Sequence, residues 1–216
     1  MVKVKICANK NINDAKMCLQ AKADIIGVLV GQKHHSNDFI DKEQALKIRK
    51  YIAKKAKVAL VTHLKNADEI IELTKFIGNE IIQLHSDILE SEVKKIVAAL
   101  KDIELVRLIH IAKDGKVITD YKKIIYANYY LLDSFNLSTN QVGGTGLTHD
   151  WNKSKEIIKL LDKPTFLAGG LNPLNVADAI KITNAYGVDV NSGVKNDLLE
   201  KDFEKVKKFV YNAKHL

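Results

Sequence analysis

Three segments follow one another along the chain: Val58-Ala-Leu-Val-Thr-His63, Asn66-Ala-Asp-Glu-Ile-Ile-Glu-Leu-Thr-Lys-Phe-Ile77 and Glu80-Ile-Ile-Gln-Leu-His85. The first and third segments are short and mostly apolar, which is typical of buried strands. The middle segment has apolar residues at three- and four-residue steps, which predicts an amphipathic helix. The stretch therefore predicts a strand–helix–strand unit. Its two strands must be parallel, because the helical crossover returns the chain to the same edge of the sheet.

The same alternation continues through the rest of the sequence. We expect eight strands, at residues 2–7, 23–30, 58–63, 80–85, 104–111, 129–134, 164–170 and 187–193. Helix-start signals agree, including Asp41 before Lys42 and the Asn172-Pro173 pair before the last strand. The fifth helix, near residues 119–127, is short and tyrosine-rich. Eight regular units favour a closed (β/α)8 barrel over an open doubly wound sheet, and no Pro-, Gly- or Ser-rich linker divides residues 1–216, so we expect one domain.

Composition agrees with a globular protein and argues against several other classes. The chain has 216 residues, of which 46% are hydrophobic and 28% charged. The longest apolar runs are the length of a strand, and the first residues read as a strand, so we expect a cytoplasmic protein that does not enter a membrane. Cys7 and Cys18 lack a metal or redox spacing and are expected as free thiols. The net charge of +8 comes from lysines interleaved with acids, with no RNA- or DNA-binding signature, so we expect no nucleic-acid partner.

Glycine-rich clusters stand at the ends of the last three strands. They are Gly143-Gly144-Thr145-Gly146, Ala168-Gly169-Gly170 and Asn191-Ser192-Gly193. Such residues let backbone N–H groups converge on an anion beside a helix N-terminus, and barrels often bind phosphate with the loops after strands seven and eight. A lone Gly-Gly pair is equally typical of a tight turn. Three clusters at successive strand ends instead predict a phosphate site.

The order and spacing of several motifs resemble the phosphoribosylanthranilate isomerase family over nearly the whole chain. They are Lys5-Ile6-Cys7, Asp14-Ala15, Ala23-Asp24, Gly27, Gln83-Leu84-His85, Leu132-Asp133, Gly143-Gly144-Thr145-Gly146, Asp150-Trp151, Ala168-Gly169-Gly170-Leu171, Pro173, Asn175-Val176 and Val188-Asp189-Val190-Asn191-Ser192-Gly193-Val194. The resemblance implies a (β/α)8 enzyme of tryptophan biosynthesis. It also implies an Amadori rearrangement, which converts an aminoaldose phosphate into an aminoketose phosphate.

The resemblance implies roles for two residues and no metal or organic cofactor. Cys7 matches the family's base, which removes the C2 proton, and Asp133 matches its acid, which protonates the ring oxygen. Cys7 then needs a local positive field to become a thiolate, and Asp133 needs desolvation or a nearby anion to keep its proton. Each residue also has a plainer interpretation: Cys7 as a small buried hydrophobe at a strand end, and Asp133 as a helix cap or loop anchor.

The sequence departs from the family where the aromatic half of the substrate would bind. Asp38 stands where the family has an arginine that binds the anthranilate carboxylate, which predicts repulsion of that group, and Lys195 stands at a usually acidic position. The candidates for substrate binding are Lys10, Lys33, His34, His35, Asp38, His85 and Arg107. Arg107, one of only two arginines, lies within the fifth strand and could point into the barrel mouth. A metal site from His34, His35 and Asp38 is conceivable, but adjacent histidines on a loop rarely suffice.

Three hypotheses follow. The first is a phosphoribosylanthranilate isomerase with a rebuilt carboxylate site. The second is a paralogous isomerase that uses Cys7 and Asp133 on another sugar phosphate without that carboxylate. The third is a non-catalytic barrel that binds a phosphorylated ligand. In each, the partner is a small phosphorylated sugar, and the sequence leaves a monomer and a homodimer open.

Overall fold

The computed structural model describes residues 1–31, 36–112, 114–136, 141–142 and 150–216. The strands are β1 (Lys3–Ile6), β2 (Ile25–Leu29), β3 (Lys57–Thr62), β4 (Ile81–Leu84), β5 (Glu104–Ala112), β6 (Tyr129–Asn136), β7 (Gln141–Val142), β8 (Thr165–Leu167) and β9 (Gly187–Val190). The helices are α1 (Ile12–Gln20), α2 (Lys42–Ile52), α3 (Ala67–Ile77), α4 (Glu90–Ala99), α5 (Trp151–Leu160), α6 (Val176–Thr183) and α7 (Phe203–Lys214), with 3-10 turns η1 (Tyr121–Lys123) and η2 (Ser192–Val194).

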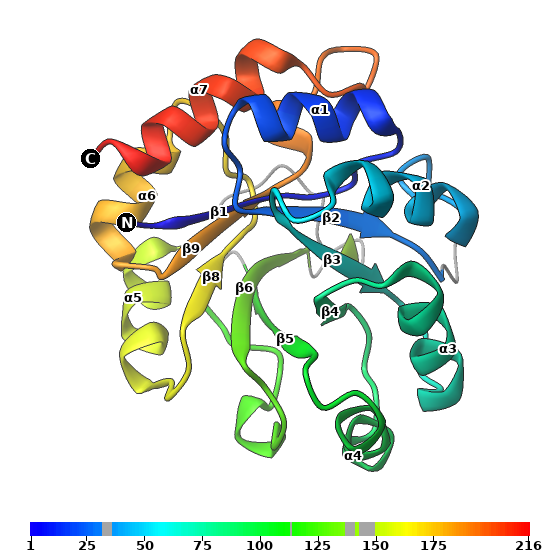
Figure 1. Ribbon diagram of the computed structural model, residues 1–216. Coiled ribbons are helices and arrows are strands. Elements are labelled where there is room, and N and C mark those ends of the chain that lie inside the picture. The colour runs from blue at the N-terminus through cyan, green and yellow to red at the C-terminus, as the bar shows by residue number, and fades with distance from the viewer. Residues whose placement is uncertain (32–35, 113, 137–140, 143–149) are drawn as a thin grey trace.

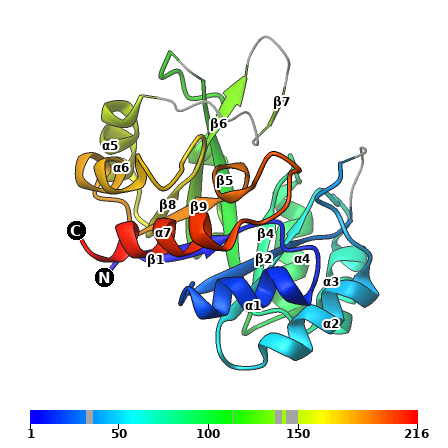
Figure 2. The same ribbon diagram turned by 90° about the horizontal axis from the view of Figure 1, so that it is seen from above.

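Eight parallel strands close into a barrel, as the sequence predicts. The strand order is β5-β4-β3-β2-β1-β9-β8-β6, and a further pairing of β5 with β6 closes the ring. Helices surround the barrel on the outside (Figures 1 and 2). The short strand β7 is antiparallel to β6 and was not predicted. The barrel accounts for the described chain from β1 to α7, while the expectation of one domain over residues 1–216 stays a prediction.

Side chains alternate between the inside of the barrel and the helical layer, because successive residues of a strand point to opposite faces. Inside, one apolar cluster joins Ile25, Ala59, Ile81, Val106, Leu108, Leu131, Phe166 and Ala168. Outside, Val4 and Ile6 of β1 pack in the large cluster that includes residues of α1, α2, α6 and α7. Lys5 and Cys7 alternate with Val4 and Ile6 and therefore face inward.

Helix ends follow local sequence signals in most cases. Asn66 caps α3 by accepting from the backbone N–H of Glu69, and Gly78 ends that helix in the left-handed region. Asp41 caps α2 as predicted.

Two helical expectations are wrong. Only the single turn η1 occupies the fifth helical position, and α6 begins at Val176 rather than at the Asn172-Pro173 pair. The reason at α6 is a turn in which the Asn172 side chain accepts from the N–H of Leu174 and the Asn175 side chain accepts from that of Asn172.

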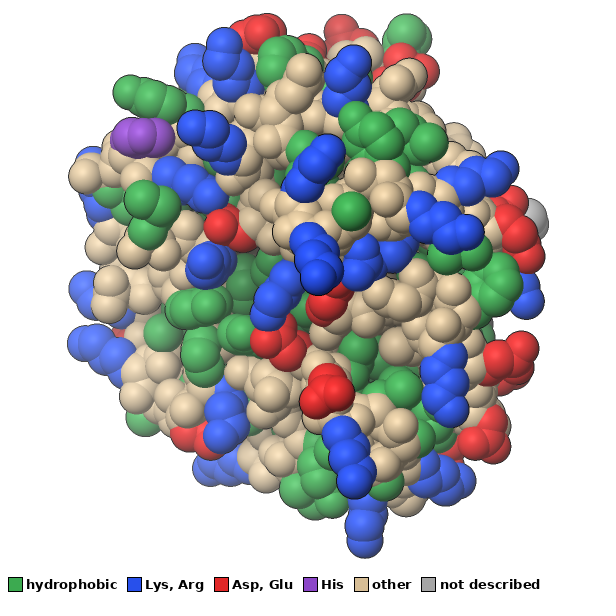
Figure 3. All heavy atoms as spheres, in the orientation of Figure 1, with side chains coloured by type: hydrophobic (Ala, Val, Ile, Leu, Met, Phe, Trp, Pro, Cys, Tyr) green, Lys and Arg blue, Asp and Glu red, His purple; other side chains and the backbone are tan. Residues whose placement is uncertain are grey.

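Aromatic rings pack together at the amino-terminal end of the barrel, beside a surface hollow. Tyr129, Phe166 and Tyr186 contact one another with ring centroids 5.5–5.7 Å apart. The hollow has a volume of about 760 Å³ and is lined by these rings and by several lysines. Figure 3 looks onto this end and shows lysine side chains around the hollow. It lies opposite the carboxyl ends of the strands, where barrel active sites form. No described helix is both long and apolar enough to cross a membrane.

Candidate active site

Cys7 and Asp133 both lie at carboxyl ends of barrel strands, on the inner face. Cys7 directly follows β1 and its side chain is buried, and Asp133 lies in the second half of β6 and is 6% exposed. Leu131, two residues before Asp133, belongs to the inner cluster, so the alternation turns Asp133 inward. Gly27 of β2 leaves room for the thiol, because a Cβ on Gly27 would lie 3.2 Å from Cys7 Sγ.

A buried ion pair lies beside both residues. Lys5 Nζ is 2.7 Å from Asp189 Oδ2, and the two side chains are 3% and 7% exposed. The register of β1 against β9 sets Lys5 directly opposite Asp189. Asp189 Oδ1 and Gln83 Oε1 are buried and accept no hydrogen bond from any described residue. Both oxygens are therefore available to the hydroxyl groups of a ligand.

Burial and the Lys5–Asp189 pair shape the proton affinities of Cys7 and Asp133. Burial, reinforced by the charge of Asp189, raises the pKa of Asp133 to about 7. Burial also raises the pKa of the Cys7 thiol, although the ammonium groups of Lys5 and Lys201 oppose this effect. Asp133 thus holds a proton near neutral pH, as an acid should, whereas Cys7 is a thiol in the free protein.

The loops after β8 and β9 meet through glycines. Gly169 and Gly170 follow β8 with φ of 82° and 64°, a region that favours glycine. Gly193, in the turn after β9, approaches the other loop so closely that a Cβ there would lie 2.0 Å from the carbonyl oxygen of Leu171. Ala168, Asn191 and Ser192 lie in the same two segments. The structure thus brings two of the three predicted phosphate-binding clusters together.

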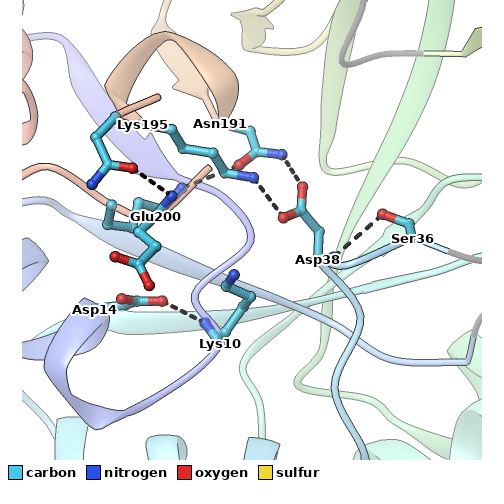
Figure 4. A network of polar contacts seen from close by, with 9 residues as sticks. Lys10, Asp14, Ser36, Asp38, Asn191, Lys195 and Glu200 are labelled. Carbon is cyan, nitrogen blue, oxygen red and sulfur yellow. Dashed lines mark hydrogen bonds and ion pairs between the residues drawn. The ribbon is translucent and has the colours of Figure 1, made fainter. Parts of the chain in front are cut away.

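A second ion pair lies at the mouth of the barrel (Figure 4). Lys195 Nζ lies 2.5 Å from Asp38 Oδ1, and Asn191 Nδ2 donates to Asp38 Oδ2 at 2.8 Å. Asn191 in turn accepts from Lys201 Nζ at 3.1 Å. The sequence predicts a repulsive carboxylate at position 38, but in the structure an ammonium from the β9 loop neutralises it.

Two further candidates lie at the same end of the barrel. His85 follows β4, stacks on His63 with ring centroids 5.2 Å apart, and lies 3.2 Å from the Gln83 amide through Nδ1. Phe39 packs edge-on against His63, which extends this ring stack. Lys10 lies in the loop between β1 and α1, where its backbone N–H donates to Asp14.

Arg107 does not join them. Its guanidinium lies 2.7 Å from Glu90 of α4 and donates to the carbonyl of Tyr126. The neighbouring residues Val106 and Leu108 take the inward positions of β5, so the alternation turns Arg107 toward the helical layer. The expectation that Arg107 points into the barrel mouth is therefore corrected.

Several predicted site residues lie outside the described part of the chain. They are Lys33, His34 and His35 after β2, and Gly143, Gly144, Thr145 and Gly146 after β7. Among the residues that are described, no group of three or more His, Cys, Asp or Glu side chains could hold a metal ion.

Sequence reasoning missed three charged residues. Lys5 and Asp189 each stand between apolar residues of a strand, a signal that such a charge must be paired when buried. Lys201 carries no such local signal. It is 5% exposed, and burial lowers its pKa.

A carboxyl group and a thiol on the inner face of a (β/α)8 barrel, near the carboxyl ends of its strands, lie where barrel enzymes have their active sites. The family described as N-(5'-phosphoribosyl)anthranilate isomerase matches residues 4–212. The chain is 38% identical over 216 residues to N-(5'-phosphoribosyl)anthranilate isomerase 2 of Methanosarcina mazei, with 99% of this chain and 95% of the relative covered. The chain belongs to the N-(5'-phosphoribosyl)anthranilate isomerase family.

Solved structures agree with this family. One is described as monomers of the dimeric isomerase from Thermotoga maritima, with a TM-score of 0.81, 26% identity and complete coverage of both chains. Another is an isomerase in complex with reduced 1-(o-carboxyphenylamino)-1-deoxyribulose 5-phosphate, with a TM-score of 0.79, 25% identity and complete coverage of both chains.

Proposed function

We propose that the chain converts N-(5'-phosphoribosyl)anthranilate into 1-(o-carboxyphenylamino)-1-deoxyribulose 5-phosphate, with Asp133 as acid and Cys7 as base. The observation that carries this proposal is the placement of a proton-holding carboxyl and a thiol on the inner face of one barrel, at strand ends beside the glycine loops. Family membership supports the same reaction.

Asp133 supplies the first proton. With a pKa of about 7 it is largely protonated at slightly acidic pH, so it can protonate the furanose ring oxygen. The bond between C1 and that oxygen then breaks, and the nitrogen lone pair forms a protonated Schiff base. Asp133 is left as a carboxylate close to the ammonium of Lys5, which favours its charged form.

Cys7 takes the second proton. Its thiol must first ionise, and Lys5 and Lys201 already act against the effect of burial. The cationic Schiff base adds a third positive charge at the step where the thiolate is needed. The thiolate removes the C2 proton, the electron pair moves to the iminium, and an enolamine forms. A proton moves to C1 and the enol proton leaves, which gives the ketone.

The remaining groups hold the substrate. The backbone of Gly169, Gly170 and Gly193 suits the phosphate, because Gly193 brings the loop after β9 against Leu171 of the loop after β8, and Gly169 and Gly170 have positive φ in that second loop. The buried oxygens Asp189 Oδ1 and Gln83 Oε1 accept no described donor and suit the ribose hydroxyls. These assignments need no metal ion and no organic cofactor.

The test is a fluorescence assay. Purified protein is mixed with phosphoribosylanthranilate that is generated in the same reaction, and the loss of anthranilate fluorescence is measured. Turnover that both Cys7→Ser and Asp133→Asn reduce by 10²-fold or more would support the proposal, since a positioned acid or base contributes roughly 10²–10⁴-fold. Cys18→Ser is the matched control, because Cys18 lies in α1, packs in the cluster between the barrel and its helices, and donates its thiol to the side chain of Asn9.

One alternative substrate class would apply if the Asp38 carboxylate, rather than the Lys195 ammonium paired with it, faced the ligand. A carboxylate at the mouth would suit another phosphorylated aminosugar whose aglycone lacks an anionic group. Folded protein that binds inorganic phosphate but leaves phosphoribosylanthranilate unchanged would favour this second reading.

We place the reaction in tryptophan biosynthesis and in the cytoplasm. The Thermotoga maritima relative is described as dimeric. Sedimentation of this protein will distinguish a monomer from a homodimer.

A further inference from the structure

Asp38 is fixed in place from two directions. The backbone just after it runs beside β2, with Phe39 bridged to Leu29 and the N–H of Ile40 donating to the carbonyl of Leu29 at 3.0 Å. Its carboxylate is held by Asn191 and Lys195 from the loop after β9 (Figure 4). The loops that follow β2 and β9, the two neighbours of β1 in the barrel, are thus joined to each other.

The ammonium of Lys195 is held in place and has N–H donors that no described residue accepts. Its side chain is 8% exposed, and Asp38 is its one acceptor among the described residues. An ammonium has three N–H donors, so two remain for a ligand. Although burial works against it, hydrogen bonds from Lys195 and Asn191 hold the pKa of Asp38 below its usual value. Asp38 therefore stays ionised and keeps the ammonium oriented.

The other described cations near the site either contact other residues or have no described partner that would fix their position. Lys5 is paired with Asp189 inside the barrel, and Arg107 is paired with Glu90 in the helical layer. Lys201 donates to the side chain of Asn191, below the ion pair. The ammonium of Lys10 has no described partner, so nothing fixes its position, and it is the competing candidate.

We propose that Lys195 is a specificity-determining residue, whose ammonium receives the aromatic carboxylate of phosphoribosylanthranilate, and that Asp38 is the positioning residue that orients it. This inference rests on the proposed function. The phosphate lies at the glycine loops after β8 and β9, and the carboxylate at the opposite end of the substrate meets the Asp38–Lys195 pair. The carboxylate of Asp38 does not repel the substrate, because Lys195 lies between the two anions.

The test compares two substrates that differ in one group. The first is phosphoribosylanthranilate, and the second is the analogue made from aniline, which lacks the carboxylate; both form from the amine and ribose 5-phosphate. Lys195→Gln should lower kcat/KM for the anthranilate compound roughly 10- to 100-fold, mainly through KM, as expected for loss of one charged hydrogen bond. For the aniline compound kcat/KM should change less than about twofold.

Three further variants test the same assignment. Lys205→Gln is the matched control, because the Lys205 ammonium is exposed and donates, among the described residues, to the backbone carbonyl of Lys195 at 2.7 Å. Turnover of both substrates should be unaffected. Asp38→Ala should raise KM for the anthranilate compound alone, with kcat within about threefold, since it frees the ammonium without removing it. Asp38→Asn, which keeps an acceptor for Lys195, should restore part of that loss.

Three results would overturn the inference. Equal losses with both substrates for Lys195→Gln would mean that Lys195 supports the loops rather than binds the carboxylate. A change in substrate preference with Lys10→Gln but not with Lys195→Gln would move the role to Lys10. If the wild-type protein converts the aniline compound but not the anthranilate compound, Asp38 excludes a carboxylate. That result would overturn this inference but not the proposed Amadori reaction. No turnover of either compound would instead defeat the proposed function, and this inference with it.

Discussion

The ammonium of Lys5 and the carboxylate of Asp189 lie 2.7 Å apart inside the barrel, on two strands whose register sets them directly opposite each other. They come from the first and last barrel strands of the sequence, β1 and β9, which pair with each other in the sheet. The charge of each acts on both proposed catalytic groups, Cys7 and Asp133. The pair thus links the stability of the closed barrel to the proton affinities at its mouth.

Removing one partner of this pair should be costly. Lys5→Met leaves the Asp189 carboxylate buried without its cation and should lower the free energy of unfolding by about 3–5 kcal/mol. Lys3→Met is the control two residues away, because Lys3 is half-exposed and its 3.7 Å pair with Asp24 should contribute less than about 1 kcal/mol. Urea unfolding measures both.

The double variant Lys5→Met with Asp189→Asn should lose less stability than the sum of the two single variants. Strict additivity would show that the two side chains act independently, contrary to their contact in the barrel.

Asp133 should make stability depend on pH. Its pKa rises from 3.8 to about 7 in the folded state, so between these values the folded protein binds more protons than the unfolded chain. Stability should therefore fall as pH rises from about 4 to 7, by roughly 3–4 kcal/mol relative to Asp133→Asn. Denaturant melts of both proteins across this range isolate the contribution. A difference that stays constant with pH would contradict the raised pKa of Asp133.

Cys7 should react slowly with iodoacetamide near neutral pH in the free protein. Burial raises the pKa of its thiol, and only the thiolate attacks. The rate should rise close to tenfold per pH unit through pH 9, as the thiolate fraction grows. Mass spectrometry of the two cysteine peptides measures it, with Cys18 as internal control, since burial raises the pKa of that thiol to about 12. Rapid labelling of Cys7 at pH 7 would mean that Lys5 and Lys201 outweigh burial.

Gly193→Ala should separate the two proposed phosphate loops. Its Cβ would lie 2.0 Å from the carbonyl oxygen of Leu171, so one loop must move. Inorganic phosphate should bind at least about tenfold more weakly in calorimetry, because the converging backbone N–H groups are displaced. Gly78→Ala is the control: it strains a positive φ at the end of α3, but its Cβ would meet no atom within 4 Å, so phosphate binding should be unchanged. Unaltered binding by Gly193→Ala would exclude these loops as the site.

Most of the barrel could be predicted because its signals are local. The strand–helix unit from Val58 to His85 has periodicity and caps that reappear in β3, α3 and β4. The prediction of a fifth helix is wrong because residues 119–127 lack a continuous apolar stripe. Among the described residues of this segment, only the turn η1 forms. Strand β7 could not be predicted for another reason. Its two residues pair antiparallel to β6, and no pattern within Gln141–Val142 indicates that contact.

The charged parts of the site were harder to predict because they depend on contacts between distant segments. Arg107 has the same local pattern whether it faces the mouth or α4, and only the inward positions of Val106 and Leu108 decide between them. Asp38 and Lys195 were each recognised as departures from the family pattern. Their contact could not be inferred, because nothing in either loop points to the other across 157 positions of sequence.

The Asp38–Lys195 contact also restricts how this protein can change over generations. A substitution that placed a cation at position 38 would set two ammonium groups face to face in a nearly buried place, and an acid at position 195 would do the same with two carboxylates. An exchange of the two charges between the loops must therefore pass through a neutral residue at one position or change both together. The charges at positions 38 and 195 are therefore expected to change together rather than one at a time.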